Sequence, residues 1–239
     1  MRLKIVVALV AGLLSFGAPA AAQNAVPSAP LAVPALTPDN ILHLDLSTGG
    51  RVSIQLRPDV APRHVERVKT LARQGFYNGL LFHRVIEGFM AQTGDPTGTG
   101  TGGSPLPDMA AEFNGLPHVR GVVSAARADD PNSANSQFFI VFAPRLSLDG
   151  KYSVFGRVVS GMQYVDAIER GEPPANPSRI VKASIGSDNR PPPTPQEVAA
   201  AMARQPAPVE QAQAPVPPTT PAPAAPPPAA QPQTPATQP

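Results

Sequence analysis

The sequence predicts a mainly β domain, a closed antiparallel barrel with helices at its ends. Residues 40–190 contain many short runs of apolar residues, several alternating with polar ones, and turn residues separate the runs. Only two stretches there repeat apolar residues with the period of a helix. The residues on either side are rich in Pro and show neither pattern. We therefore expect one domain at 40–190 between disordered segments.

A β-hairpin begins the domain. Residues 41–46 and 51–56 are short apolar runs, the second alternating with polar residues, and a Thr-Gly-Gly turn lies between them. A helix is predicted to begin at Pro62, with its apolar residues on one face, and to end at Gly75.

The remainder of the domain is mostly strands. Apolar runs predict strands at residues 81–85, 89–92, 121–126, 137–142, 152–159 and 179–185. A second helix is predicted at residues 161–170. Many short strands with two helices favour a barrel over a layered α/β fold.

Strand periodicity assigns side chains to faces. Because alternate residues share one face of a strand, we expect Phe82, Arg84 and Ile86 to point one way. For the same reason, Phe139 is expected to point away from Phe138. A charged Arg84 inside so apolar a run is a candidate functional group. The alternative is a structural Arg that is salt-bridged or extends its head to water.

Residues 1–22 have the pattern of a secretory signal peptide: two basic residues, an apolar run and small residues before the cleavage site. Cleavage after Ala20 or Ala22 fits equally well. An uncleaved membrane anchor is the alternative, but the run is shorter than the ~20 residues that a span needs. We therefore expect export to a bacterial periplasm, without stable membrane insertion once the signal is removed.

Both flanking segments are rich in Pro. Residues 23–39 are predicted to form a Pro/Ala-rich linker, and residues 191–239 a disordered Pro/Ala/Gln-rich tail. The tail has too few large apolar side chains to offset the entropy of ordering. Within it, residues 194–204 combine a capping Thr, a Pro at the first helical position and good helix formers, which predicts a short helix.

Composition excludes several classes of chemistry. The absence of Cys excludes a disulfide framework, a Cys-based zinc site and a thiol nucleophile. Without the signal, basic and acidic residues are equal in number, so binding to nucleic acid is not expected. The 4 His residues lack the spacing of metal ligands, so we expect no metal and no cofactor.

The Gly-rich run at residues 94–103 is not typical of a nucleotide-binding loop. It lacks the Lys of a P-loop, and Ser-Pro-Leu-Pro follows it where a dinucleotide-binding motif needs a helix. A serine hydrolase is not indicated either, because no G-x-S-x-G motif is present and the spacing implies no partner for His83. We expect a surface loop whose glycines permit positive φ.

Three blocks carry the strongest signal: FHRVIEGFMAQTGD at residues 82–95, DPNSANSQFFI at 130–140 and LDGKYSVFG at 148–156. In this order and spacing they resemble the cyclophilin family of peptidyl-prolyl cis-trans isomerases. The resemblance covers about residues 40–186, and the Gly-rich loop is similar to that of compact bacterial members. It implies an eight-stranded closed barrel capped by two helices, with the active groove on its outside.

The resemblance also implies roles for ten residues. Arg84 matches the catalytic Arg, and Gln92 the residue that orients it and contacts the peptide backbone. The expected substrate-binding residues are Phe89, Met90, Ala126, Arg127, Gln137, Phe139, Leu148 and Tyr152. Four of them match an apolar proline pocket: Phe89, Met90, Phe139 and Leu148. Ala126 and Arg127 match a strand edge whose backbone N–H would hold the carbonyl before proline.

The implied substrates are extended Pro-containing segments of exported proteins during folding, and the implied enzyme needs no cofactor. Ser147 stands where many members have Trp, which predicts weak cyclosporin binding. Tyr152 replaces a common His and Ala125 a common Met, so we expect altered sequence preference.

Other functions remain to be distinguished. A binding module of the same fold, acting as a chaperone or scaffold without turnover, is the main alternative. We expect a monomer. The tail is expected to be a solvated spacer, although one of its X–Pro bonds entering the groove as a competitor is the alternative.

Overall fold

The computed structural model describes residues 35–203. The chain divides into two units, Met1–Leu36 and Thr37–Pro239, and every element below belongs to the second. The predicted signal peptide, residues 23–34 of the linker and the tail beyond residue 203 lie outside the described residues. Within the described part, no helix combines the length and hydropathy required to cross a membrane.

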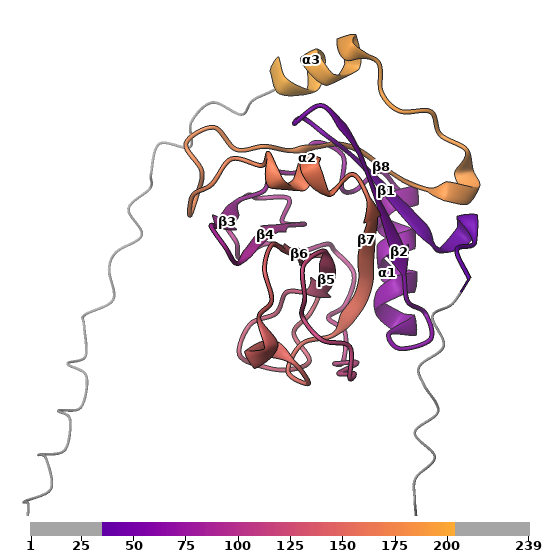
Figure 1. Cartoon of the computed structure of the whole chain (residues 1–239), viewed down its shortest axis with the longest axis vertical. Helices are drawn as coiled ribbons and strands as arrows, with labels where there is room; N and C mark the ends of the chain where they lie inside the picture. The colour runs from indigo at the N-terminus through magenta and orange to yellow at the C-terminus, as the bar shows by residue number, and fades with distance from the viewer. Residues whose placement is uncertain (1–34, 204–239) are drawn as a thin grey trace, which may run out of the picture. The chain divides into compact units, whose positions relative to one another are not determined.

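Within residues 35–203, eight strands form one sheet, and every hydrogen-bonded pair of strands is antiparallel (Figure 1). Their spatial order is β3-β4-β6-β5-β7-β2-β1-β8. The strands are β1 Ile41–Leu46, β2 Gly50–Leu56, β3 Arg84–Ile86, β4 Met90–Thr93, β5 Val122–Ala125, β6 Phe138–Val141, β7 Val154–Ser160 and β8 Ile180–Ile185. The predicted mainly β, antiparallel architecture is confirmed.

The closed barrel is not confirmed, because β3 and β8 are the two ends of the strand order. An isolated bridge between Leu81 and Arg179 and a hydrogen bond from the Gly79 N–H to the Ile180 carbonyl join the segment before β3 to the beginning of β8. β3 has 3 residues, and its Val85 pairs with Gly171 on the free edge. β3 is therefore too short, and its free edge too occupied, for a continuous ladder of hydrogen bonds with β8.

In the part of the chain that the structure describes, three α-helices accompany the sheet: α1 Pro62–Arg73, α2 Met162–Asp166 and α3 Pro195–Ala203. α1 agrees with its prediction, and a carboxylate from a distant loop caps it, since Glu112 accepts the backbone N–H groups of Arg63 and His64 at 3.1 and 3.0 Å. α2 is shorter than predicted. The helix ends at Asp166, and Ile168, which follows it, is buried.

The helix expected at the start of the tail is present as α3, next to β8. Thr194 and Glu197 exchange hydrogen bonds at its beginning: the Thr194 backbone N–H donates to the Glu197 carboxylate at 2.6 Å, and the Glu197 N–H donates to Thr194 Oγ1 at 3.3 Å. This reciprocal pattern is a capping box.

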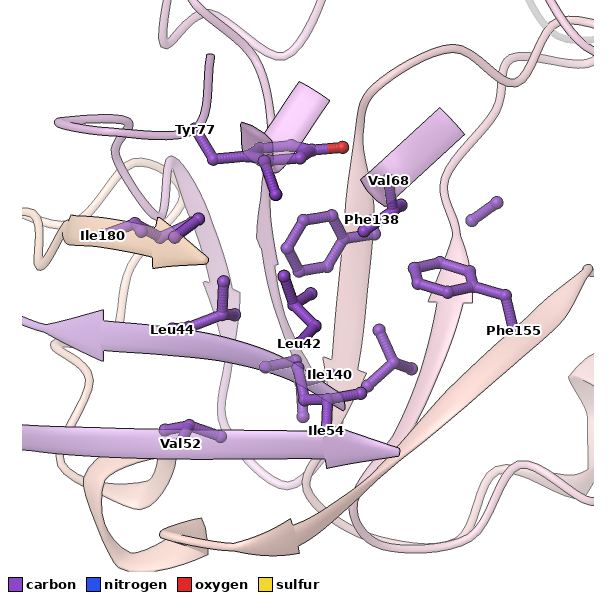
Figure 2. Packing of buried hydrophobic residues seen from close by; sticks show 14 of the residues in the cluster. Leu42, Leu44, Val52, Ile54, Val68, Tyr77, Phe138, Ile140, Phe155 and Ile180 are labelled. Carbon is purple, nitrogen blue, oxygen red and sulfur yellow. The ribbon is translucent and has the colours of Figure 1, made fainter. Parts of the chain in front are cut away.

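The main apolar core lies on one face of the sheet. In Figure 2, side chains of β1, β2, β6, β7, β8 and α1 point toward one another, among them Leu42, Ile54, Val68, Phe138, Ile140, Phe155 and Ile180. Phe82 also belongs to this core. Its prediction was wrong: β3 begins only at Arg84, so Phe82 precedes the strand and does not share the face of Arg84 and Ile86.

Two buried histidines make the stability of the domain depend on pH. His64 and His83 are 1% and 6% exposed, and burial lowers the pKa of each from 6.5. The Glu112 carboxylate, 2.6 Å from Nδ1 of His64, opposes this shift only in part. Asp95 and Glu112 have pKa values below 3.8 and 4.5, so their protonation affects a lower pH range.

We predict that the free energy of unfolding decreases as the pH falls below about 6.5. The unfolded chain then binds protons on these two imidazoles, whereas the folded chain binds them only at lower pH, so protonation stabilises the unfolded state relative to the folded one. Urea titrations near pH 7.5 and near pH 5.5 measure the difference. An equal free energy of unfolding at the two pH values would contradict the prediction.

Candidate active site

A second apolar cluster is distinct from the main core. Its buried members are Met90, Val122, Ala126, Phe139, Val141 and Val154, and the partly exposed members are Ile86, Phe89, Leu116, Val119, Leu148 and Tyr152. Strand alternation produces it, because Phe138 and Ile140 of β6 enter the main core while Phe139 and Val141 face the other way. The cluster joins six of the ten predicted site residues: Phe89, Met90, Ala126, Phe139, Leu148 and Tyr152.

Arg84 lies beside this cluster. It pairs with Gln92 across β3 and β4, and Gln92 pairs with Phe139 across β4 and β6, so the three residues share one face. The Arg84 side chain is 46% exposed. A guanidinium and an apolar surface therefore lie side by side on the face away from the core.

Two predicted site residues are joined through their amides. Gln92 Nε2 donates to Gln137 Oε1 at 2.8 Å, and Gln137 Nε2 donates to the carbonyl oxygens of Gly100 and Gly102 at 2.9 and 2.8 Å. These bonds attach the Gly-rich loop to the sheet. The resemblance assigned Gln92 to Arg84, but in the described structure the Gln92 amide donates to Gln137.

A buried carboxylate organises the Gly-rich loop. Asp95 accepts the backbone N–H groups of Thr97 and Gly100 at 2.7 and 2.6 Å. Burial alone would raise the pKa of Asp95, but hydrogen bonds from Thr97, Gly102 and Gly100 outweigh it and hold the pKa below its ordinary value. As predicted, glycines here have positive φ, 70° at Gly98 and 90° at Gly100. The loop is therefore shaped by its own contacts.

His118 supports the apolar cluster from beneath. Its ring stacks on Phe139 with centroids 6.2 Å apart and meets the ring of Tyr152 edge-on at 6.3 Å. Its Nδ1 lies 2.9 Å from Asp149 Oδ1, and its Nε2 lies 3.2 Å from Ser124 Oγ. The order Asp-His-Ser is that of a hydrolase triad, but His118 and Ser124 are fully buried, so a substrate carbonyl has no access.

The strand edge predicted to bind the peptide, at Ala126 and Arg127, is only partly free to do so. The Ala126 N–H donates to the Gln137 carbonyl at 3.0 Å, because the β5–β6 ladder continues through it, so it cannot also hold a peptide carbonyl. Of the two predicted edge residues, Arg127 is left for that role. Its guanidinium lies 4.7 Å from the centroid of Tyr152 and donates to the Lys151 carbonyl at 3.1 Å. This side chain covers one side of the Tyr152 ring.

Sequence reasoning missed the partner of Arg84. Its Nε donates to Glu172 Oε2 at 2.7 Å, across 88 positions of sequence. Arg84 is thus salt-bridged, as the structural alternative expected, and also half exposed beside the apolar cluster. No motif marked Glu172. A role for His118 in the site could have been suspected, because its partner Asp149 belongs to the LDGK block.

Two hollows of about 710 and 390 Å³ lie elsewhere on the surface. Arg73, Asn78 and Lys182 are among the residues that line the first, and Arg67 and Met109 among those of the second. Neither is lined by a residue of the second apolar cluster. The candidate site is therefore defined by its side-chain chemistry: a surface of apolar and aromatic groups, an exposed guanidinium and hydrogen-bonded amides.

Comparisons with known proteins agree with this geometry. The family model described as "Cyclophilin type peptidyl-prolyl cis-trans isomerase/CLD" matches residues 43–185. A probable peptidyl-prolyl cis-trans isomerase of Brucella suis is 49% identical over 172 residues, which cover 65% of this chain and 87% of the relative. The Schizosaccharomyces pombe isomerase ppi1 is 40% identical over 151 residues, with 59% and 97% covered.

Solved structures agree as well. Cyclophilin AquaCyp293 of Hirschia baltica has a TM-score of 0.60 and 33% identity, covering 65% of this chain and 77% of its own. A Cryptosporidium parvum cyclophilin-type isomerase, crystallised in the presence of the dipeptide Ala-Pro, has a TM-score of 0.57 and 28% identity, covering 61% and 98%.

The fold and the matches define the chain as an enzyme, an isomerase with the cyclophilin fold. It belongs to the cyclophilin-type peptidyl-prolyl cis-trans isomerase family.

The His118 contacts predict an effect of Asp149 on peptide binding. In Asp149→Ala, the ring of His118 loses the acceptor that holds its Nδ1, so Phe139 and Tyr152 lose a fixed support. We expect KM for an Ala-Pro test peptide to rise about fivefold, the effect of one lost hydrogen bond. Steady-state kinetics measure it, with the exposed carboxylate variant Asp129→Ala as control. An unchanged KM in Asp149→Ala would refute this support role.

Proposed function

We propose that this isomerase accelerates rotation about X–Pro bonds by Arg84-assisted stabilisation of the twisted imide, with the proline ring held on the second apolar cluster. The observation that carries the proposal is the position of Arg84. Its half-exposed guanidinium lies in one cross-strand row with Gln92 and Phe139, at the margin of the apolar surface.

The chemistry requires a donor for a transient lone pair. An X–Pro bond rotates slowly because resonance gives its C–N bond partial double-bond character, with a barrier of about 18–20 kcal/mol. Twisting the bond makes the proline nitrogen pyramidal and returns its lone pair. A guanidinium near that nitrogen stabilises the twisted state more than either planar state, which lowers the barrier. Rotation breaks no covalent bond, so it needs no nucleophile.

The remaining site residues would bind different parts of the substrate. Phe89, Met90, Phe139, Leu148 and Tyr152 would enclose the proline ring, which keeps it fixed while the acyl side turns. Arg127 would pair with the peptide main chain, and Gln137 would form the wall between the apolar surface and the Gly-rich loop. Arg suits the catalytic position because it stays charged and carries a rigid set of donors.

The substrates we propose are extended Pro-containing segments of exported proteins as they fold. The N-terminal pattern of residues 1–22 supports a periplasmic location. A fusion of residues 1–39 to a reporter that is active only outside the cytoplasm tests the location.

We further propose that the enzyme acts as a monomer, and that the tail is a spacer. Deletion of residues 204–239 should then leave KM unchanged.

The mechanism predicts a large loss of activity in Arg84→Ala. Removal of one donor aimed at developing charge typically lowers kcat by about 10²-fold or more, and we expect a loss of that order in kcat/KM. The melting temperature should change little because the side chain is half exposed. The cis-to-trans relaxation of an Ala-Pro test peptide measures the activity, and Arg157→Ala, an exposed Arg of β7, is the matched control.

Two outcomes would count against this mechanism. Undiminished acceleration by Arg84→Ala would leave the isomerase activity intact but remove Arg84 from its mechanism. If the wild-type chain binds the peptide and does not accelerate its relaxation, the alternative of a binding module with chaperone or scaffold function would replace the catalytic one.

A further inference from the structure

A carboxylate outside the family motifs holds the proposed catalytic Arg. Nε of Arg84 donates to Oε2 of Glu172 at 2.7 Å, the short distance of a charge-assisted hydrogen bond. The side chains are 46% and 50% exposed. Exposed ion pairs of this kind contribute little to stability. The contact is therefore better explained by what it does to Arg84 than by what it adds to the fold.

The loop that carries Glu172 is attached to β3 at this point. Gly171 and Val85 exchange two backbone hydrogen bonds, of 2.8 and 2.9 Å. Because this bridge is antiparallel, the residue after Gly171 lies beside the residue before Val85. Those residues are Glu172 and Arg84. The main chain thus brings the carboxylate and the guanidinium together.

The shape of this loop depends on a glycine. Gly171 has a φ of +146°, and a Cβ there would lie 2.5 Å from the Cα of Pro174. A larger residue would displace the turn that follows and with it Glu172. The carboxylate is consequently placed by a fixed turn, although its side chain is half exposed.

Gln92 does not supply this support. Its side chain faces Arg84 across the β3–β4 pair, but its Nε2 donates to Gln137. Among residues 35–203, the hydrogen-bond partner of the Arg84 guanidinium is Glu172. In the described structure, the guanidinium is therefore held by a residue on the adjoining loop and not by the residue across the sheet.

We propose that Glu172 is a positioning residue for catalysis, which holds Arg84 by its Nε and leaves both Nη groups free for the substrate. This inference rests on the proposed function of Arg84. A guanidinium has five N–H donors in one plane, so engaging Nε fixes that plane and leaves four donors. An unpaired Arg must lose side-chain rotamer freedom in the transition state, whereas a paired Arg has lost much of it beforehand.

The test compares Glu172→Ala with wild type in the full mature chain. We expect kcat for the Ala-Pro peptide to fall about fivefold with KM unchanged, because Arg84 acts on the twisted state. Glu172→Gln keeps an acceptor oxygen and should recover about half of the loss on a logarithmic scale. The matched control is Asp166→Ala, which removes the carboxylate of another exposed ion pair, with Arg120 at 2.6 Å.

Two further measurements separate positioning from a general structural role. In an Arg84→Lys background, the side chain has no Nε–H of the guanidinium type, so Glu172→Ala should lower kcat less than twofold. The melting temperature should be the same in Glu172→Ala and Asp166→Ala. The Nε–H resonance of Arg84 in a ¹H–¹⁵N spectrum should exchange faster with water in Glu172→Ala than in wild type.

The outcomes are distinguishable from failure of the proposed function. If Arg84→Ala loses activity and Glu172→Ala keeps the wild-type kcat, the positioning role is wrong and the function of Arg84 stands. A higher kcat in Glu172→Ala would overturn the proposal too, because the carboxylate would then be a competitor of the substrate. If Arg84→Ala is fully active, the mechanism and this inference both fail.

Discussion

Side-chain alternation along β6 is the constraint on which the core and the site both depend. Phe138 enters the main core, while Phe139, the next residue, belongs to the second apolar cluster. Because successive residues of a strand point to opposite faces, one short strand supplies the interior with one ring and the candidate site with the other. A register slip of one residue would exchange the two rings and lose both structures. The pairing of β6 with β4 and β5 fixes this register, so the position of the site follows from the sheet.

The polar groups of the site are ordered by contacts that reach well beyond the strands. Gln137, which precedes β6, accepts from Gln92 and donates to carbonyls of the Gly-rich loop, and Asp95 holds that loop from within. His118 joins the floor of the apolar cluster to Asp149 of the LDGK block. Each of these polar groups is hydrogen-bonded to protein atoms, and together the contacts join several loops into one preorganised surface.

Much of the fold could be predicted from the sequence because its determinants are local. Strand alternation and the turn residues identified the strands, and the capping Thr194, the Pro195 that follows it and the good helix formers after them identified α3. The open ends of the sheet could not be predicted, since they depend on the length of β3 and on its bridge to Gly171. The prediction for Phe82 was wrong for a similar reason: strand alternation was applied to a residue that precedes the first residue of β3.

The site was predictable where motifs carry it and hidden where distant loops meet. The resemblance singled out Arg84, but its orientation comes from Glu172, 88 residues away on a loop without a motif. This contact depends on the tertiary structure, because the bridge between Gly171 and Val85 is what places the two charges side by side. Since both side chains remain half exposed, the pair adds little to stability and can vary without unfolding the domain. The outer face is thus where a fold of this kind can adjust catalysis while its core stays the same.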